Sequence, residues 1–289
     1  MKFGLRYCNT GRFTDPTRAV ELVQAGEAAG FESAWTVEHT VIPRGYQSAY
    51  PYTADGKLPG GEGDFVLPDP LIWMAYVAAA TMRIHLATGI LILAQHNPVV
   101  CAKQVATLDA MSGGRVLLGI GVGWLKEEFE AIGVPFEDRG RRTDEYIAAM
   151  RALWSQDVPT HHGEFVNFTD AFMRPKPVHR AVPIIIGGQT PPAARRAGRL
   201  AQGFFPGRGV PRDLIELARR TATTHDRNPA DIEITVSIPD DLDEIPRLAE
   251  FGVGRVLVPV TGVAGLHGVI RGAEDVLKWR DVIDRYADV

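Results

Sequence analysis

The sequence predicts a (β/α)8 barrel, because three observations agree. Short apolar segments alternate with amphipathic ones nearly from end to end of the 289 residues, and such alternation is typical of a parallel sheet whose strands are joined by helices. Eight units can be recognised, and eight favour closure into a barrel over an open sheet. No linker divides the chain, so we expect one domain over residues 1–289.

The predicted strands are short runs rich in apolar residues. Three consecutive isoleucines at 184–186 are typical of a strand that is buried on both faces, as strands of parallel sheets are. The expected strands cover residues 2–8, 32–37, 83–93, 115–121, 182–186, 203–206, 232–238 and 255–260.

Capping residues mark the helices between these strands. Asp15 followed by Pro16 opens the first helix and Gly30 ends it, because a carboxylate accepts free amides at a helix start and glycine adopts the left-handed end conformation. Asn97-Pro98 and Thr190-Pro191 give the same start signal. The helices are expected over residues 16–30, 68–81, 97–110, 143–155, 214–224, 242–251 and 273–286, with others beginning at 126 and 191.

One connection is far longer than the few residues usual in such folds. Residues 38–69 leave the carboxyl end of the second strand, the face where barrel enzymes have their active sites. The loop contains Tyr46, Tyr50, Tyr52 and Phe65, so we expect an aromatic lid over an apolar ligand. A smaller insertion at 160–176 is also expected near the site.

Composition excludes several classes of function. The chain has 31 basic and 35 acidic residues, a net charge of −4, whereas nucleic-acid binding needs a dense basic surface. The longest apolar run, 71–82, is too short to span a membrane. Cys8 and Cys101 alone cannot form a disulfide framework or a zinc site. We therefore expect a cytoplasmic enzyme or ligand-binding protein without nucleic-acid or membrane partners.

Two glycine-rich segments follow predicted strands. Gly119, Gly121 and Gly123 do not form the dinucleotide fingerprint; they would let a flat ring or a phosphate approach the backbone, or merely relieve crowding. The segment 187–191, Gly-Gly-Gln-Thr-Pro, joins a buried strand to a helix start, where amides bind anions. Arg208 is available to neutralise a phosphate there, although a solvated surface arginine is the alternative.

His39 is the clearest candidate for proton transfer. It directly follows the second strand and its pKa range lets it give or take a proton near neutral pH. Cys8, at the end of the first strand, is a candidate pocket residue, and a buried inert thiol is its alternative. The other histidines share no spacing typical of metal ligands, so we expect no metal. No P-loop or serine-hydrolase motif is present.

Four stretches carry a family resemblance. They are EAAGFESAWTVEH at 27–39, HNPVVCAKQVATLDAMSGGRVLLGIGVGW at 96–124, EEFEAIGVPFEDRGRRTDEYIAAMRALW at 127–154 and VPIIIGGQTPPAARRAGRLAQGFFP at 182–206. Together they resemble the luciferase-like monooxygenase superfamily, a group of flavin- or deazaflavin-dependent (β/α)8 barrels. The resemblance is nearest to oxidoreductases that use coenzyme F420, an 8-hydroxy-5-deazaflavin.

This resemblance implies roles for several residues. Gly89-Ile90 aligns with a bulge in the third strand, where a non-proline cis peptide supports the rear of the cofactor ring. His39 aligns with a histidine proposed as acid and base in F420-dependent sugar-phosphate dehydrogenases. The remaining implied cofactor contacts are Gly121, Val122 and Gly123 beside the ring, and Gly187, Gly188, Gln189, Gly203 and Phe204 at the phosphate.

Three positions depart from the family pattern. Glu38 and Gln202 stand where aspartates are usual. Trp124 stands where the sugar-phosphate dehydrogenases carry a catalytic glutamate, which argues against sugar-phosphate oxidation. An indole wall beside an aromatic lid favours an apolar or aromatic substrate instead.

The sequence thus predicts an oxidoreductase that transfers hydride between F420 and a small organic substrate. Three alternatives stay open: an FMN-dependent monooxygenase, a non-catalytic flavin- or F420-binding protein, and a phosphate-handling barrel lyase or isomerase. The resemblance also implies a homodimer, since relatives are commonly dimers.

Overall fold

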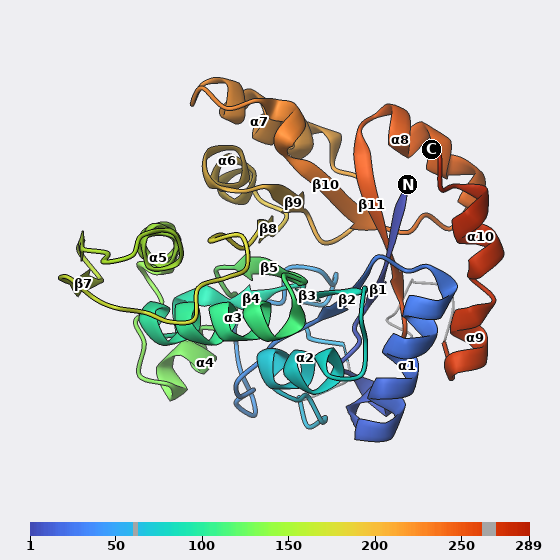
Figure 1. Ribbon diagram of the computed structural model, residues 1–289, viewed down its shortest axis with the longest axis horizontal. Coiled ribbons are helices and arrows are strands. Elements are labelled where there is room, and N and C mark those ends of the chain that lie inside the picture. The colour runs from blue at the N-terminus through green and yellow to red at the C-terminus, as the bar shows by residue number, and fades with distance from the viewer. Residues whose placement is uncertain (60–62, 262–269) are drawn as a thin grey trace.

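A computed structural model describes residues 1–59, 63–261 and 270–289 and confirms the predicted barrel (Figure 1). Its parallel strands are β1 (Lys2–Arg6), β2 (Ser33–Thr36), β3 (His85–Thr88), β5 (Val116–Gly121), β8 (Ile184–Gly187), β9 (Gly203–Phe205), β10 (Glu233–Ser237) and β11 (Val253–Pro259). They pair in this order, and the ring closes because β1 also pairs with β11.

Helices surround the strands, as Figure 1 shows. They are α1 (Pro16–Ala29), α2 (Pro70–Ala78), α3 (Pro98–Ser112), α4 (Lys126–Ala131), α5 (Arg139–Ser155), α6 (Pro191–Leu200), α7 (Arg212–Thr223), α8 (Ile245–Glu250), α9 (Ala273–Leu277) and α10 (Arg280–Arg285). The helix expected over 273–286 is therefore two short helices. The insertion at 160–176 contains a two-stranded antiparallel hairpin, β6 (His161–His162) and β7 (Asn167–Phe168).

The expected helix caps are present. Asp15 accepts a hydrogen bond from the amide of Arg18 at 3.0 Å, and Gly30 ends α1 with φ +94°. Asn97 caps α3 through the amides of Val99 and Val100, and Thr190 caps α6. These local signals fix where each helix begins, and hence where each preceding loop ends.

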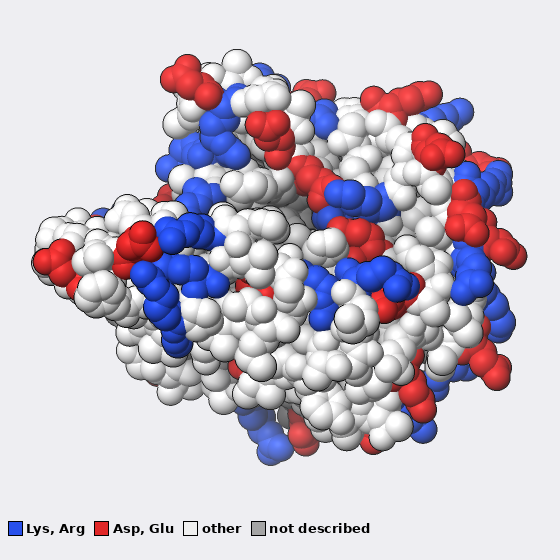
Figure 2. Space-filling view, viewed as in Figure 1, with Lys and Arg blue, Asp and Glu red and all other residues white. Residues whose placement is uncertain are grey.

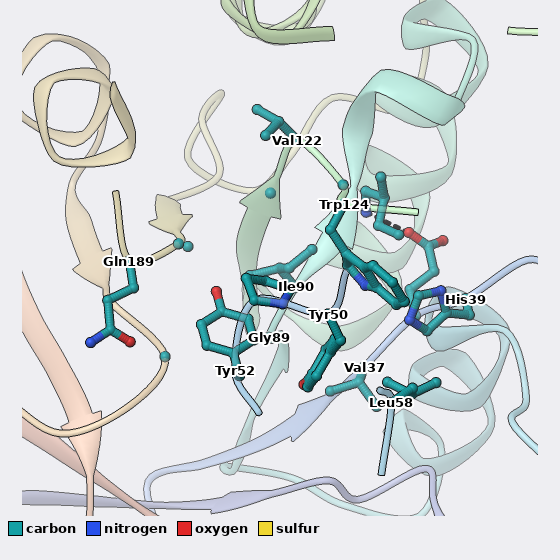
Figure 3. A pocket seen from close by; sticks show the side chains of 18 of the residues that line it. Val37, His39, Tyr50, Tyr52, Leu58, Gly89, Ile90, Val122, Trp124 and Gln189 are labelled. Atoms are coloured by element: carbon teal, nitrogen blue, oxygen red, sulfur yellow. Dashed lines mark hydrogen bonds between the residues drawn. The ribbon is translucent and has the colours of Figure 1, made fainter. Parts of the chain in front are cut away.

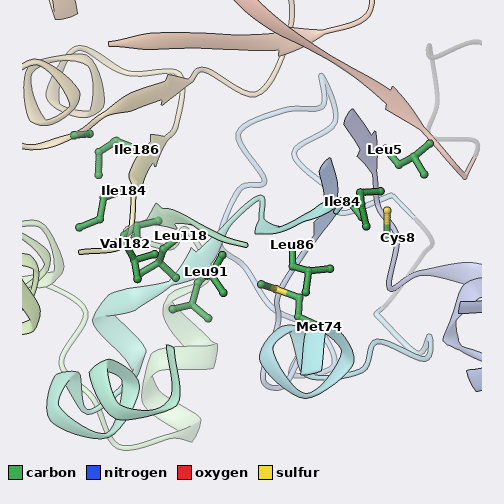
Figure 4. Close-up of a cluster of buried hydrophobic side chains, with 14 of the residues drawn as sticks. Leu5, Cys8, Met74, Ile84, Leu86, Leu91, Leu118, Val182, Ile184 and Ile186 are labelled. Carbon is green, nitrogen blue, oxygen red and sulfur yellow. The ribbon is translucent and has the colours of Figure 1, made fainter. Parts of the chain in front are cut away.

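Side chains fill the barrel in layers. Near the amino-terminal ends of the strands, Arg255 is 1% exposed and forms ion pairs with Glu32 and Glu233. Above it lies an apolar layer that includes Trp35 and Phe205, whose rings meet edge to face. A larger core, part of which is drawn in Figure 4, packs the outside of the strands against the helices.

One face of the surface is unusually apolar. Figure 2 shows few charged side chains over α2 and the adjacent part of α3. Exposed apolar side chains there are Ile72, Tyr76, Val99, Val100 and Met111. Within the described residues, no helix is both long and apolar enough to cross a membrane.

The third strand is interrupted where the sequence places the bulge. A cis peptide joins Gly89 to Ile90, as predicted, and the chain continues in β4 (Leu91–Ile92), which pairs with β5. Close approach of backbone explains a glycine beside this break. A Cβ atom on Gly119 would lie 1.8 Å from the carbonyl oxygen of Thr88, so any other residue there would force β3 and β5 apart.

A buried ion pair holds the chain just after the break. Glu38 accepts hydrogen bonds from the Ile92 amide and, at 2.8 Å, from Nε2 of His96. Burial alone would lower the pKa of His96, but its hydrogen bond to Glu38 and the charge of that carboxylate outweigh burial and raise it. His96 therefore stays protonated to higher pH in the folded chain than in the unfolded one.

This pair predicts a pH dependence of stability. The pKa of His96 is raised in the folded state. Its contribution to the free energy of unfolding is therefore complete below the unfolded-state pKa of about 6.5 and is lost as the pH rises through the raised pKa. The difference in free energy of unfolding between wild type and His96→Gln should therefore shrink from pH 6 to pH 9. Urea unfolding at both pH values measures it.

The exposed His225 supplies the control, because His225→Gln should leave the pH profile of the wild type unchanged. A difference between wild type and His96→Gln that stays constant over this range would contradict the assignment.

Candidate active site

A cavity of about 1570 Å³ opens at the carboxyl ends of the barrel strands. Most of the residues predicted from the sequence line it: His39, Gly89, Ile90, Gly121, Val122, Gly123, Trp124, Gly187, Gly188, Gln189 and Arg208. In Figure 3, His39 and Trp124 lie on one side and Gln189 on the opposite side, with Ile90 between them. Residues from β1, β4, β5, β8 and β9 thus meet at one site with residues from the segments that follow the strands.

Three predicted site residues do not line the cavity. Cys8 is fully buried in the core outside the barrel (Figure 4), because β1 ends at Arg6 and Tyr7 turns the chain with φ +67°. Burial raises the pKa of the Cys8 thiol to about 12, so the thiol is inert. Gly203 and Phe204 begin β9 and lie below the cavity, which instead receives Phe205, Gly207 and Arg208.

His39 is held by a carboxylate that sequence analysis missed. Its Nδ1 lies 3.0 Å from Oε2 of Glu128. The second oxygen of Glu128 accepts the amides of Thr40 and Val41 at 2.6 and 3.2 Å. An ionised carboxylate only accepts hydrogen bonds, so Nδ1 of His39 carries its hydrogen and Nε2 is left for a ligand.

The side chain of Glu128 is fully buried and that of His39 is 11% exposed. Glu128 comes from α4, 89 residues further along the chain than His39, and only the closed barrel brings the two together. A base oriented by a buried carboxylate is a recurring arrangement for proton transfer.

The long loop after β2 contributes the aromatic side chains of Tyr50, Tyr52 and Phe65 to the cavity wall. Behind them Tyr46 is buried, and the rings of Tyr46 and Tyr50 meet Trp124 edge to face, with centroids 5.5 and 5.1 Å away. Burial is the main cause that raises the pKa of Tyr50 to about 12, so its hydroxyl stays protonated near neutral pH. Residues 60–62 of this loop lie outside the described residues.

Glu127, the neighbour of Glu128, anchors the loop. It accepts the amides of Gln47 and Ser48 at 2.6 and 3.1 Å and the Ser48 hydroxyl at 2.6 Å. Burial is the largest single influence and would raise the pKa of Glu127, but the hydrogen bonds together outweigh it and lower the pKa to about 2. The carboxylate is therefore charged over the whole physiological range.

Basic side chains also line the cavity. They are Arg139, Arg196 and Arg208. Arg196 is paired with Asp144, while Arg139 donates only to the carbonyls of Gly123 and Phe136 among the described residues. These arginines are suited to the phosphate or carboxylate groups of a ligand.

The start of α6 offers fewer amides than its glycines suggested. Pro191 and Pro192 have no N–H, the Gly188 amide donates to the carbonyl of Phe205, and the Ala193 amide donates to Thr190. The positive charge of the cavity therefore comes mainly from the arginine side chains and less from the helix start.

The cavity fits a flavin or a deazaflavin. It exceeds the roughly 300–1,000 Å³ typical of small-molecule pockets, so a ring cofactor and a substrate can share it. Ile90 projects as an apolar floor, and the arginines supply charge where a phosphate would lie. Ring and phosphate would thus be bound by different parts of the cavity.

Sequence analysis also missed Arg6. This residue is 9% exposed, lines the cavity and reaches across the barrel to the Gly207 carbonyl and the Ser237 hydroxyl at 3.0 and 3.1 Å. A lone basic residue near the end of the first strand carried no signal, since its distant partners come from β9 and β10.

Known proteins share this sequence pattern. An uncharacterized protein of Mycobacterium tuberculosis is 34% identical over 263 residues, 89% of this chain and 91% of that protein. The F420-dependent glucose-6-phosphate dehydrogenase of Kineococcus radiotolerans is 30% identical over 243 residues, 81% of this chain and 66% of that enzyme. The FMNH2-dependent dimethylsulfone monooxygenase of Pseudomonas putida is 39% identical over 131 residues, 44% and 36% of the two chains.

Solved structures share the fold. The coenzyme F420-dependent tetrahydromethanopterin reductase of Methanopyrus kandleri superposes with a TM-score of 0.75 over 99% of both chains, at 17% identity. A monooxygenase of Streptomyces bottropensis gives 0.73 over 99% of this chain and 100% of that one, at 22% identity. A family model described as luciferase-like monooxygenase matches residues 5–244. The chain therefore belongs to the luciferase-like monooxygenase family.

Proposed function

We propose that this protein is an oxidoreductase that transfers hydride between coenzyme F420 and a small organic substrate. The observation that carries the proposal is the His39–Glu128 pair, which lies at the rim of a cavity whose apolar floor is Ile90. Relatives named as F420-dependent and as FMNH2-dependent both exist, so an FMN-dependent monooxygenase is the second candidate.

Each part of the cavity has a separate task in this proposal. When bound, a deazaflavin supplies the ring carbon that gives or takes hydride. Ile90 and the aromatic wall of Tyr50 and Trp124 exclude water and hold the reacting groups in place. Nε2 of His39 gives a proton to the substrate oxygen during reduction, or takes one during oxidation. Glu128 keeps the imidazole in the required tautomer.

The substrate class follows from Trp124. The indole occupies the position of a carboxylate in relatives that oxidise sugar phosphates, and its ring lies edge to face with His39 at a centroid distance of 5.8 Å. A flat apolar or aromatic substrate would pack on this wall beside the proton donor. Trp124 therefore supports an apolar or aromatic body for the substrate.

The first test concerns the cofactor. F420 should bind at least tenfold tighter than FMN, a difference of ~1.4 kcal/mol, because its tail carries more negative charges toward Arg139, Arg196 and Arg208 than the single phosphate of FMN does. Fluorescence titration of the purified protein with each cofactor measures both affinities.

Arg208→Met sharpens this comparison. It should weaken F420 binding about tenfold, as the loss of a charged hydrogen bond typically does. Arg12→Met should not, because Arg12 is exposed and its side chain does not line the cavity. Equal or tighter binding of FMN would favour the monooxygenase. Binding of neither cofactor would contradict both candidates.

The second test concerns His39. His39→Ala should lower turnover by about 10²–10⁴-fold, the usual contribution of a general acid or base, with F420 affinity within about twofold of wild type. Absorbance of F420 follows the reaction with the best substrate from a panel of secondary alcohols, aldehydes and quinones.

Two further variants separate catalysis from structure. Glu128→Gln should shift the pH profile of turnover as well as lower it, because it alters the tautomer of His39 and not the imidazole itself. His225→Ala should change nothing. Full turnover by His39→Ala would remove the proposed role, and a matching loss of cofactor affinity would make His39 a binding residue.

The apolar face over α2 and α3 supports a homodimer. Ile72, Val100 and Met111 are 72%, 54% and 83% exposed in the single chain, and exposed apolar patches of this kind mark interaction surfaces. Light scattering after size exclusion should give about twice the 31.6 kDa chain mass. Ile72→Glu should give the mass of a single chain, whereas a monomeric wild type would refute the dimer.

A further inference from the structure

Arg6 is a buried cation with unused hydrogen-bond donors. A guanidinium has five N–H donors, and among the described residues Arg6 uses two of them, both from Nη1, on the Gly207 carbonyl and the Ser237 hydroxyl. Nε is buried without any partner, and no hydrogen bond of Nη2 to a described residue is seen. Because Nε has no accessible surface, Nη2 is the nitrogen left to donate to an anion in the cavity.

Other buried arginines of the described chain have acidic or carbonyl partners. Arg115 donates from all three of its nitrogens to carbonyls and to the Thr81 hydroxyl, and Arg142 donates to the Pro135 carbonyl. Arg255, at the bottom of the barrel, is paired with Glu32 and Glu233, and Arg196, on the cavity wall, is paired with Asp144. Arg6 forms no ion pair with a described residue. Because a buried charge is costly without a partner, an anionic partner for Arg6 is expected to come from a ligand.

Aromatic rings hold the guanidinium in place. Its central carbon lies 4.5 Å from the ring centre of Tyr7 and 4.7 Å from that of Phe205. Adjacent residues of a regular strand face opposite sides, yet Arg6 and Tyr7 both line the cavity. The left-handed backbone of Tyr7, with φ +67°, makes this possible. Such a conformation is uncommon for a bulky residue and is often found at binding sites.

Acidic groups near the cavity are few and already engaged. Among the described residues that line it, the acids are Glu38 and Glu137. Glu38 is bound to His96 and to the Ile92 amide, and Glu137 lies 3.8 Å from the Lys126 amine. The phenols of Tyr50 and Tyr52 share the cavity with Arg6, and burial raises the pKa of both, so they remain donors.

From this geometry we propose that Arg6 is the substrate-recognition residue of the site and that it binds the carboxylate of an organic acid. The proposal rests on the function proposed above and narrows the substrate class. The carboxylate accepts hydrogen bonds from Nη2 of Arg6, and the apolar body of the acid extends along the aromatic wall toward Trp124 and His39. The substrate is thus an aromatic or apolar carboxylic acid that carries a second group able to exchange hydride.

The experiment uses benzoate and its neutral counterpart benzamide as probes. Tryptophan fluorescence of the full chain, with and without F420, measures both affinities. Wild type should bind benzoate at least tenfold tighter than benzamide. Arg6→Gln should reduce this preference to less than about twofold, and Arg6→Lys should retain only part of it, because an ammonium lacks the fixed, planar donors of a guanidinium.

A control variant shows whether the preference depends on Arg6. The exposed Arg12→Gln should keep the benzoate preference. Circular dichroism confirms the fold of each variant. If Arg6→Gln does not fold, the benzoate-to-benzamide ratio of wild type and the effect of Arg6→Lys decide the question.

Two results for benzoate would overturn the proposal. They are equal binding of benzoate and benzamide by wild type and an unchanged preference in Arg6→Gln. A parallel loss of F420 affinity in Arg6→Gln would make Arg6 a cofactor residue and would also overturn it. Failure of wild type to bind F420 or FMN refutes the proposed function instead. Benzoate binding measured without cofactor still tests the role of Arg6 by itself.

Discussion

The insertion of Ile90 between two glycine-bearing strands sets the shape of the whole site. A Cβ atom on Gly121 would lie 2.5 Å from the Ile90 side chain, and one on Gly187 would lie 2.3 Å from it. Cβ atoms do not lie this close to other side chains in folded proteins, so β5 and β8 accommodate Ile90 in this position because they carry glycine there. These glycines therefore make room for a protein side chain first. The space above Ile90, with the arginines beyond it, is what remains for a ligand.

A second dependence links the lid to the proton-transfer residue. Two adjacent carboxylates on the short helix α4 hold different parts of the loop after β2: Glu128 binds His39 and the amides that follow it, while Glu127 binds Gln47 and Ser48. The position of α4 thus fixes both the imidazole and the start of the aromatic wall. Displacement of this helix would disturb the orientation of His39 and the cover of the cavity together.

Local signals in the sequence predicted the strands and the helix caps, because periodicity and capping depend on neighbouring residues. The break at Gly89-Ile90 was predicted from the family resemblance alone. The features that local signals could not predict depend on residues far apart in the sequence. Glu128 meets His39 only across the closed barrel. Nothing in the sequence indicates the bend at Tyr7, which brings Arg6 into the cavity and Cys8 into the core. Gly203 and Phe204 were wrongly placed for a related reason: β9 begins there, so its carboxyl end is formed by Phe205 and the residues after it.

The charge of the cavity runs opposite to that of the chain. The whole sequence has a net charge of −4, yet among the described residues that line the cavity four are arginines and two are glutamates. One of those glutamates is bound to His96. Since arginine stays charged at any physiological pH, the lining carries a net positive charge. Arg6 donates to the carbonyl of Gly207, the neighbour of Arg208, so two of these charges lie close together. Because buried charges are costly without partners, this part of the cavity favours an anionic ligand.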